Sequence, residues 1–187
     1  MAKYVTLVGS REAPQSICKV AERIGQFLSD RGFVGRSGRA IGMDSAFERF
    51  YNPDMFEAYV IKDLPNAINV RHHDMDAYEE LAASLIPHYE YLDFYSRWLH
   101  ARNTCQVLGL DLNTPSMLLI CWAPEPRRGG GVRGGTKSAV ALARRHGIPV
   151  SNLYHRDQLI KWCEKVGCDV PADPNHSSQQ DLSFLDK

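Results

Sequence analysis

The sequence predicts an α/β fold: a doubly wound, mainly parallel sheet with an inserted helical segment at about residues 75–110. Two observations indicate this class. Short apolar runs alternate with helical patterns, which is the rhythm of a parallel sheet covered by helices. Two glycine-rich turns, at 37–44 and 129–138, each follow an apolar run and open a helical pattern. This order of strand, turn and helix is a recurrent way for α/β sheets to hold phosphate.

The first third of the chain predicts three strands and two helices. Pro14 suits the first turn of a helix, apolar residues from Ile17 to Leu28 recur at helical spacing, and Gly32 ends that pattern. The predicted elements are, in order, a strand at 4–8, a helix from 14 to 32, a strand beginning at 33, a helix that carries Ala46, Phe47 and Phe50, and a strand at 59–61.

The middle of the chain, from 75 to 110, is helix-like and rich in aromatic residues. Two interpretations stay open for it. The segment forms a helical layer that packs on the sheet, or its aromatic faces form a platform on which nucleic-acid bases stack. The aromatic residues concerned are Tyr78, Tyr89, Tyr91, Phe94, Tyr95 and Trp98.

The strand and helix rhythm returns after this segment. Residues 117–122 form a continuous apolar run, typical of a buried central strand. A helix from the second glycine turn to His146, a strand at 148–150 and a helix from Arg156 to Val166 follow. We therefore expect one Rossmann-like domain over residues 1–168. Residues 169–187 are expected to form a flexible C-terminal tail, because this stretch is polar.

Composition limits the possible partners. The chain has 22 basic and 22 acidic side chains, so any site for a polyanion must be a local patch. The five scattered cysteines, the lack of an apolar run near 18 residues and the lack of a signal-peptide pattern predict a cytoplasmic protein without a membrane span. His72 and His73 are adjacent and cannot easily point at one ion, so we expect no metal and no cofactor.

The turn after the first strand, Gly9-Ser10-Arg11, is the first candidate for the binding site. The carboxyl end of a parallel strand is where doubly wound sheets bind ligands. Arg11 could clamp a phosphate with two hydrogen bonds, or it could be a solvated surface residue.

The first glycine turn is the second candidate. Ser37 and Gly38 are predicted to contact the phosphate, with Gly42 completing the turn. Asp44 falls in the first turn of the next helix, so it either binds a ribose hydroxyl or simply favours the helix N-terminus.

The second glycine turn and the end of the aromatic helix complete the predicted site. Arg127 and Arg128 make this turn locally basic; the alternative is a flexible surface loop. Arginine and asparagine together suit a phosphate or a base edge. The residues predicted to bind are Arg133, Gly134, Gly135, Thr136 and Lys137 in the turn, and Arg102 and Asn103 in the helix.

Side chains for acid–base chemistry are few. Glu12, Asp44, Glu48 and Glu125 are expected near the cleft, but none belongs to an obvious catalytic motif. We therefore name no catalytic residue, and the pattern favours a binding protein over an enzyme.

The order of these motifs resembles the Rossmann-like domain of the DNA-processing protein A family, over roughly residues 3–153. That family belongs to the SLOG superfamily, which also holds the lonely-guy phosphoribohydrolases and nucleotide sensors of bacterial defence. The resemblance implies a doubly wound fold, often dimeric, that binds single-stranded DNA and loads a recombinase. By position, it implies an anion pocket lined by Arg11, Ser37, Gly38 and Arg102, with residues 134–137 opposite.

Three departures from the family pattern are visible. The aromatic segment at about 75–100 is not part of the pattern, and no winged-helix appendage follows the domain. Ala139 stands where the lonely-guy enzymes carry a catalytic glutamate, which argues against the same N-glycosidic hydrolysis. Compact versions of this kind resemble those of bacteriophages, which implies a phage origin and a host cytoplasmic location.

The first functional hypothesis is a protein that binds nucleotide phosphate or single-stranded DNA in DNA processing or recombination. The alternatives are an enzyme that hydrolyses or transfers at a nucleotide N-glycosidic bond, and a sensor or sponge for a nucleotide signal. The resemblance also suggests a homodimer. The tail residues Gln179, Leu182 and Phe184 have the spacing of peptides that dock on sliding clamps; alternatively the tail packs back on the domain.

Overall fold

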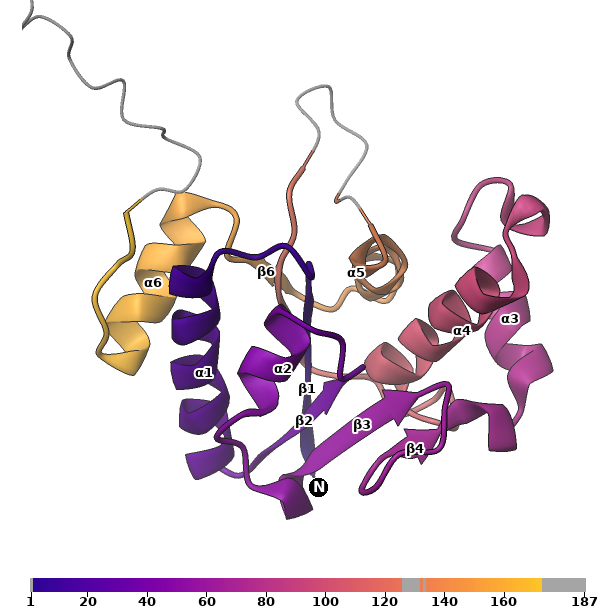
Figure 1. The fold of residues 1–187 in the computed structure, drawn as a ribbon, viewed down its shortest axis with the longest axis horizontal. Helices are drawn as coiled ribbons and strands as arrows, with labels where there is room; N and C mark the ends of the chain where they lie inside the picture. The colour runs from indigo at the N-terminus through magenta and orange to yellow at the C-terminus, as the bar shows by residue number, and fades with distance from the viewer. Residues whose placement is uncertain (1, 126–131, 133, 173–187) are drawn as a thin grey trace, which may run out of the picture.

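A single sheet of six parallel strands organises the part of the chain that the computed structural model describes, residues 2–125, 132 and 134–172. The strand order is β4-β3-β2-β1-β5-β6 (Figure 1). The strands are β1 (Lys3–Gly9), β2 (Phe33–Ser37), β3 (Phe56–Val60), β4 (Ile68–Asn69), β5 (Leu118–Trp122) and β6 (Val150–Asn152).

Helices join most of the successive strands, whereas a loop alone joins β3 to β4, and a last helix follows β6. The helices are α1 (Gln15–Asp30), α2 (Met43–Glu48), α3 (Met75–Ala83), α4 (Phe94–Leu108), α5 (Thr136–Arg145) and α6 (Arg156–Val166), with 3₁₀ turns η1 (Pro53–Met55), η2 (Val70–His72) and η3 (Tyr89–Tyr91).

The predicted fold class is confirmed, including the helical segment at 75–110, which forms α3, η3 and α4. Most strand boundaries lie within one residue of the prediction, and the starts of β3 and β6 differ by more. β3 begins at Phe56 and β6 begins at Val150. The two-residue strand β4 was not predicted, because two residues carry no readable periodicity.

Both faces of the sheet are covered, which makes the fold doubly wound. Successive side chains of a strand point to opposite faces. Val5 and Leu7 of β1 therefore pack with α1, α2 and α6, whereas Val8 packs with α4 and α5. Figure 1 shows α1 and α6 side by side on the first of these faces. A third cluster joins α3 and α4 to the end of β3 through Tyr59 and Tyr78.

Some aromatic residues of the segment 75–110 pack as a helical layer, and others are exposed, as a base-stacking platform would need. Tyr78 and Tyr89 are buried, and Trp98 packs partly against the α3–α4 cluster, as a helical layer requires. Tyr91, Phe94 and Tyr95 are exposed. Packing therefore accounts for one group of these aromatic residues and leaves the other group facing solvent.

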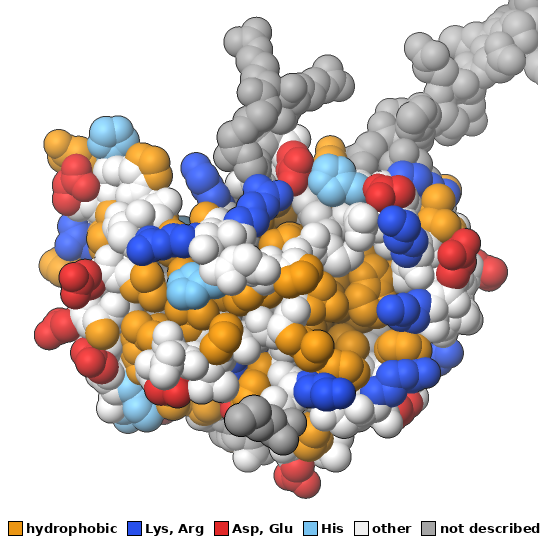
Figure 2. Space-filling view, turned by 180° about the vertical axis from the view of Figure 1, so that it is seen from behind, with side chains coloured by type: hydrophobic (Ala, Val, Ile, Leu, Met, Phe, Trp, Pro, Cys, Tyr) orange, Lys and Arg blue, Asp and Glu red, His pale blue; other side chains and the backbone are white. Residues whose placement is uncertain are grey.

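Charge is distributed as the zero net charge suggests. On the face seen in Figure 2, basic and acidic side chains are interspersed around a band of hydrophobic atoms. No helix among the described residues is both long enough and apolar enough to cross a membrane. The residues of the suggested clamp motif, Gln179, Leu182 and Phe184, lie outside the described part, as does Arg133.

Gly25 gives a direct test of the packing between α1 and α2. A Cβ at this position would lie 2.0 Å from the carbonyl oxygen of Phe47, which belongs to the backbone and cannot turn away. Gly25→Ala is expected to lower the free energy of unfolding by about 1–3 kcal/mol through overpacking. Urea denaturation followed by circular dichroism measures this.

Gly135→Ala is the matched control for this substitution. Gly135 has a φ of −61°, and a Cβ there would have no atom within 4 Å. Its cost is expected to stay within about 0.5 kcal/mol. Equal denaturation midpoints for the two variants would contradict the packing described here.

Candidate functional site

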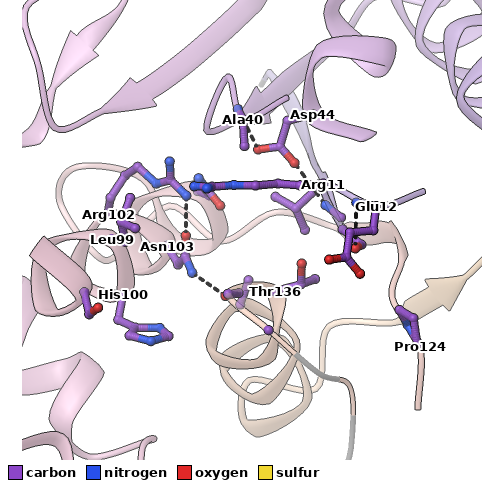
Figure 3. A pocket seen from close by; sticks show the side chains of 18 residues that line it. Arg11, Glu12, Ala40, Asp44, Leu99, His100, Arg102, Asn103, Pro124 and Thr136 are labelled. Carbon is purple, nitrogen blue, oxygen red and sulfur yellow. Dashed lines mark hydrogen bonds between the residues drawn. The ribbon is translucent and has the colours of Figure 1, made fainter. Parts of the chain in front are cut away.

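A cavity of about 540 Å³ lies at the carboxyl ends of β1 and β5. The direction of winding changes between these strands, because β2, β3 and β4 lie on one side of β1 and β5 and β6 on the other. Ligands of doubly wound sheets bind at such a switch point. The lining, shown in Figure 3, consists of Val8, Gly9, Ser10, Arg11, Glu12, Ala40, Asp44, Ser96, Leu99, His100, Arg102, Asn103, Gln106, Pro124, Gly134, Gly135, Thr136 and Ala139.

Asp44 holds the first wall of the cavity together. Its carboxylate is buried and accepts hydrogen bonds from the backbone N–H groups of Gly9 at 3.0 Å, Gly38 at 3.1 Å and Ala40 at 3.5 Å. Burial raises the pKa of Asp44, and the charge of Arg102 and these three donors oppose that rise. Asp44 thus links the end of β1 to the turn after β2, a role that neither sequence interpretation anticipated.

Gly9 and Gly42 let the two turns approach each other. A Cβ at Gly9 would lie 2.6 Å from Cβ of Met43, and a Cβ at Gly42 would lie 2.7 Å from the carbonyl oxygen of Ser10. Gly42 also has a φ of +92°, a conformation that side-chain-bearing residues rarely adopt. These two glycines are therefore needed for backbone packing.

Arg102 of α4 is partly buried beside this wall. Its Nη1 donates to the carbonyl oxygen of Gly38 at 3.1 Å and its Nη2 to Oδ1 of Asn103 at 3.0 Å. With its amide oxygen turned toward Arg102, Gln106 accepts from Nε at 3.1 Å. No described carboxylate forms a salt bridge with Arg102, so its charge is held by hydrogen bonds to neutral groups. Burial lowers the pKa of this guanidinium; the nearby charge of Asp44 opposes that lowering, and the charge of Arg11 adds to it.

Asn103 and His100 join α4 to the start of α5. Nδ2 of Asn103 donates to the carbonyl oxygen of Gly135 at 2.7 Å and to Oγ of Ser138 at 2.9 Å. Nδ1 of His100 lies 2.9 Å from the same Oγ. Burial and the nearby charge of Arg102 lower the pKa of His100. His100 is therefore largely neutral at pH 7 and can gain a charge in the cavity when the pH falls.

At Gly134 and Gly135, the second glycine turn lines the cavity with backbone that no neighbouring atoms cover. A Cβ at Gly134 or Gly135 would meet no atom within 4 Å, in contrast to Gly9 and Gly42. Thr136 begins α5, and no side chain caps this helix. The uncapped N-terminus of a helix attracts negative charge through its free N–H groups and dipole. A ligand anion can approach the backbone closely here.

Arg11 extends across the cavity toward Arg102 in Figure 3. It forms no hydrogen bond or salt bridge with the side chains of the described residues, and its charge is one of the causes that lower the pKa of Arg102. Two guanidinium groups therefore lie near each other without a carboxylate paired to either among the described residues. Such a pair repels until an anion lies between its members.

The carboxylates of the predicted cleft separate into two groups. Glu48 pairs with Arg39 at 2.6 Å, and Glu125 lies 3.7 Å from Arg144, so neither is part of the cavity lining. Glu12 does line the cavity, and its own N–H donates to Oγ of Ser10 at 3.1 Å. Apart from Asp44, which backbone donors occupy, Glu12 is the acid that the lining residues offer.

The cavity brings together most of the residues that the sequence singled out, namely Gly9, Ser10, Arg11, Asp44, Arg102, Asn103, Gly134, Gly135 and Thr136. It does not include Ser37, Gly38, Gly42 or Lys137. Ser37 is buried in β2, and Lys137 is exposed on α5. Gly38 is covered by α4, because a Cβ there would lie 2.4 Å from Nε2 of Gln106. Ser37 and Gly38 therefore lie outside the cavity lining, and their expected phosphate contacts stay a prediction.

Helix α4 contributes lining residues that the sequence interpretation missed. These are Ser96, Leu99, His100 and Gln106. Leu99, His100 and Gln106 lie three or four residues from Arg102 or Asn103, and Ser96 lies three and four residues before Leu99 and His100, so one face of the helix carries them all. Counting from Arg102 at helical spacing would have found them.

No cluster of three or more histidine, cysteine, aspartate or glutamate side chains among residues 2–125, 132 and 134–172 could hold a metal ion. No family model matches the chain. No curated protein sequence matches it.

A solved structure of DNA processing protein A from Helicobacter pylori is similar to this chain. The two share 16% sequence identity with a TM-score of 0.52, over 90% of this chain and 74% of the other. That structure gives insight into how the Helicobacter pylori protein binds single-stranded DNA. At this identity the similarity shows a shared fold, so the resemblance seen in the sequence is confirmed for the fold.

Asp44→Asn tests the role of this carboxylate. An asparagine offers one acceptor oxygen where the carboxylate has two, so a buried N–H of Gly9 or Gly38 loses its partner. The free energy of unfolding is expected to fall by about 1–3 kcal/mol. Chemical denaturation measures this.

Asp30→Asn, at the exposed end of α1, removes the same charge without touching a backbone donor. It is expected to change stability by less than about 0.5 kcal/mol. Asp44→Asn with unchanged stability would show that the two turns do not depend on this carboxylate.

Proposed function

We propose that this chain is a single-stranded DNA-binding protein of the DNA-processing protein A type, and that the cavity holds the phosphate backbone of the strand. The observation that carries this proposal is the pair Arg11 and Arg102, two cations without a paired carboxylate among the described residues, at the switch point of the sheet. The uncapped start of α5 faces the same space.

The similarity to a DNA processing protein A supports the same proposal, because that structure is described by its single-stranded DNA binding. A role in DNA processing or recombination, within the SLOG superfamily, extends this proposal. A homodimer, a cytoplasmic location and a phage origin stay predictions of the sequence, as does the clamp contact through Gln179, Leu182 and Phe184.

A second candidate function is the binding of a small nucleotide, as a sensor, a sponge or an N-glycosidic hydrolase. The volume of about 540 Å³ favours it, because pockets for small molecules span roughly 300–1,000 Å³. Hydrolysis would need a carboxylate at the sugar. Ala139 supplies none, which leaves Glu12. Release of a free base from a nucleoside monophosphate in the presence of the protein, lost in Glu12→Gln, would support this candidate.

Arg11→Ala tests the phosphate site. Arg11 is exposed, so the domain should stay folded. Its loss is expected to weaken binding of a dT oligonucleotide about 10- to 150-fold, because a hydrogen-bonded charge contact contributes about 1.5–3 kcal/mol. The slope of log K against log salt should fall by roughly one counterion. Fluorescence anisotropy at several salt concentrations measures both.

Arg23→Ala is the control for this variant, since Arg23 is a cation of α1 outside the cavity lining. It is expected to bind the oligonucleotide like the unmodified protein. Unchanged affinity in folded Arg11→Ala would overturn the assignment of the site.

His100 predicts a pH dependence. Its pKa lies below the ordinary 6.5, so it is neutral at pH 7 and gains a proton as the pH falls. A bound anion favours the protonated form, so binding takes up a proton and tightens as the pH falls below 6.5. A phosphodiester probe does not itself titrate in this range, so the dT oligonucleotide is suitable. The measurement is the dissociation constant across this range.

His100→Asn should remove this tightening, whereas His73→Asn, at an exposed position outside the lining, should keep it. A pH profile that is the same in both variants would assign the effect to another group.

A further inference from the structure

Three large aromatic side chains of the helical segment face solvent. Tyr91 is 81% exposed, Phe94 is 72% exposed and Tyr95 is 48% exposed. The same segment fills its own core with Tyr78 and Tyr89. Burial of apolar surface therefore does not explain the exposed rings, and their position relative to the cavity becomes the relevant question.

Helical spacing sets Tyr95 apart from the other two. Tyr95, Leu99, Arg102 and Gln106 follow one another at intervals of four, three and four residues, so they lie along one face of α4. Leu99, Arg102 and Gln106 all line the cavity. Tyr95 therefore continues the lining stripe by one further turn, about 10 Å along the helix axis from Arg102. Its hydroxyl is also near enough to act on the pKa of Arg102.

Phe94 belongs to a different face of the helix. Four and seven residues after it come Trp98 and Ala101, which pack in the cluster between α3 and α4. The guanidinium of Arg97 lies 5.6 Å from the Phe94 ring. Phe94 is therefore an exposed aromatic residue beside Tyr95 that does not continue the cavity stripe.

The start of α4 holds Tyr95 in place. Asp93 caps the helix, because its carboxylate accepts from the N–H of Ser96 at 2.9 Å and from the Ser96 hydroxyl at 2.8 Å. Arg97 donates to the carbonyl oxygen of Leu92 at 3.0 Å. The ring of Tyr95 thus stands on an ordered helical turn, where stacking a flat ligand costs little conformational entropy.

We propose that Tyr95 stacks an unpaired base of the strand whose phosphate lies between Arg11 and Arg102. This inference rests on the proposed function and adds a base contact to it. The occupant is a nucleic-acid base because the aromatic face continues directly from a cationic cavity, and a nucleotide joins an aromatic ring to a phosphate in one unit. Stacking needs an accessible π-face, so the contact favours single strands over duplexes and tolerates any base.

Two probes of equal length separate the base contact from the phosphate contact. One is a dT oligonucleotide, and the other is an abasic oligonucleotide with the same phosphates and no bases. Tyr95→Ala is expected to weaken dT binding about 5- to 150-fold, since stacking contributes about 1–3 kcal/mol per base. Its affinity for the abasic strand should not change. Fluorescence anisotropy measures both affinities.

Two further variants serve as controls. Tyr95→Phe keeps the ring and should keep the dT affinity. Phe94→Ala removes an exposed ring outside the stripe and should leave both affinities unchanged. Thermal unfolding of each variant checks that the domain remains folded.

The outcomes separate this inference from the proposed function. If the unmodified protein binds both probes equally and Arg11→Ala weakens both, the phosphate site stands and the stacking contact is overturned. The stacking contact is also overturned if Tyr95→Ala binds dT with normal affinity, or if its affinities for both probes fall equally. The first of these results would indicate that the exposed Tyr95 contacts a protein partner instead. If the unmodified protein binds neither probe, both proposals fall.

Discussion

The carboxylate of Asp44 is the interaction on which the site depends. Strand β1 ends at Gly9 and Gly38 directly follows β2, and one buried carboxylate accepts from the N–H groups of both glycines. That arrangement fixes the distance between the turns and makes Gly9 and Gly42 necessary, because no side chain fits between them. It also presents the carbonyl oxygen of Gly38 to Arg102 of α4. The cavity is the space that remains once these contacts are made.

A partly buried cation, Arg102, gives this space its chemistry. Removing Arg102 from water is unfavourable unless its donors and charge are satisfied. Neutral oxygens of Gly38 and Asn103 satisfy part of its donors, and no described carboxylate pairs with its charge. Asn103 in turn fixes Gly135 at the start of α5, so the network that buries Arg102 also positions the open helix N-terminus across the cavity. The same contacts therefore leave Arg102 without a salt bridge among the described residues and create the space where an anion can lie beside it.

The sequence could predict the fold because its periodicities are strong. The apolar run in β1 is buried on both faces of the sheet, and the helical repeat in α1 buries one face of that helix. The site was harder to predict. Glycine permits close approach to a side chain as well as to a phosphate, and only the fold shows that α4 covers Gly38 while Gly135 is open. The partners of Asp44 are backbone N–H groups, which no residue pattern reveals.

Under the proposed function, the balance of charge makes a base contact important for the affinity. A strand held by a few cations gains little from counterion release, because that gain scales with the number of phosphates neutralised. The chain has zero net charge, and its described surface mixes both signs on the face of Figure 2. Affinity for a single strand must then come largely from contacts that duplexes cannot make. The phase of α4, which places Tyr95 on the same face as Arg102, provides one such contact within reach of the phosphate site.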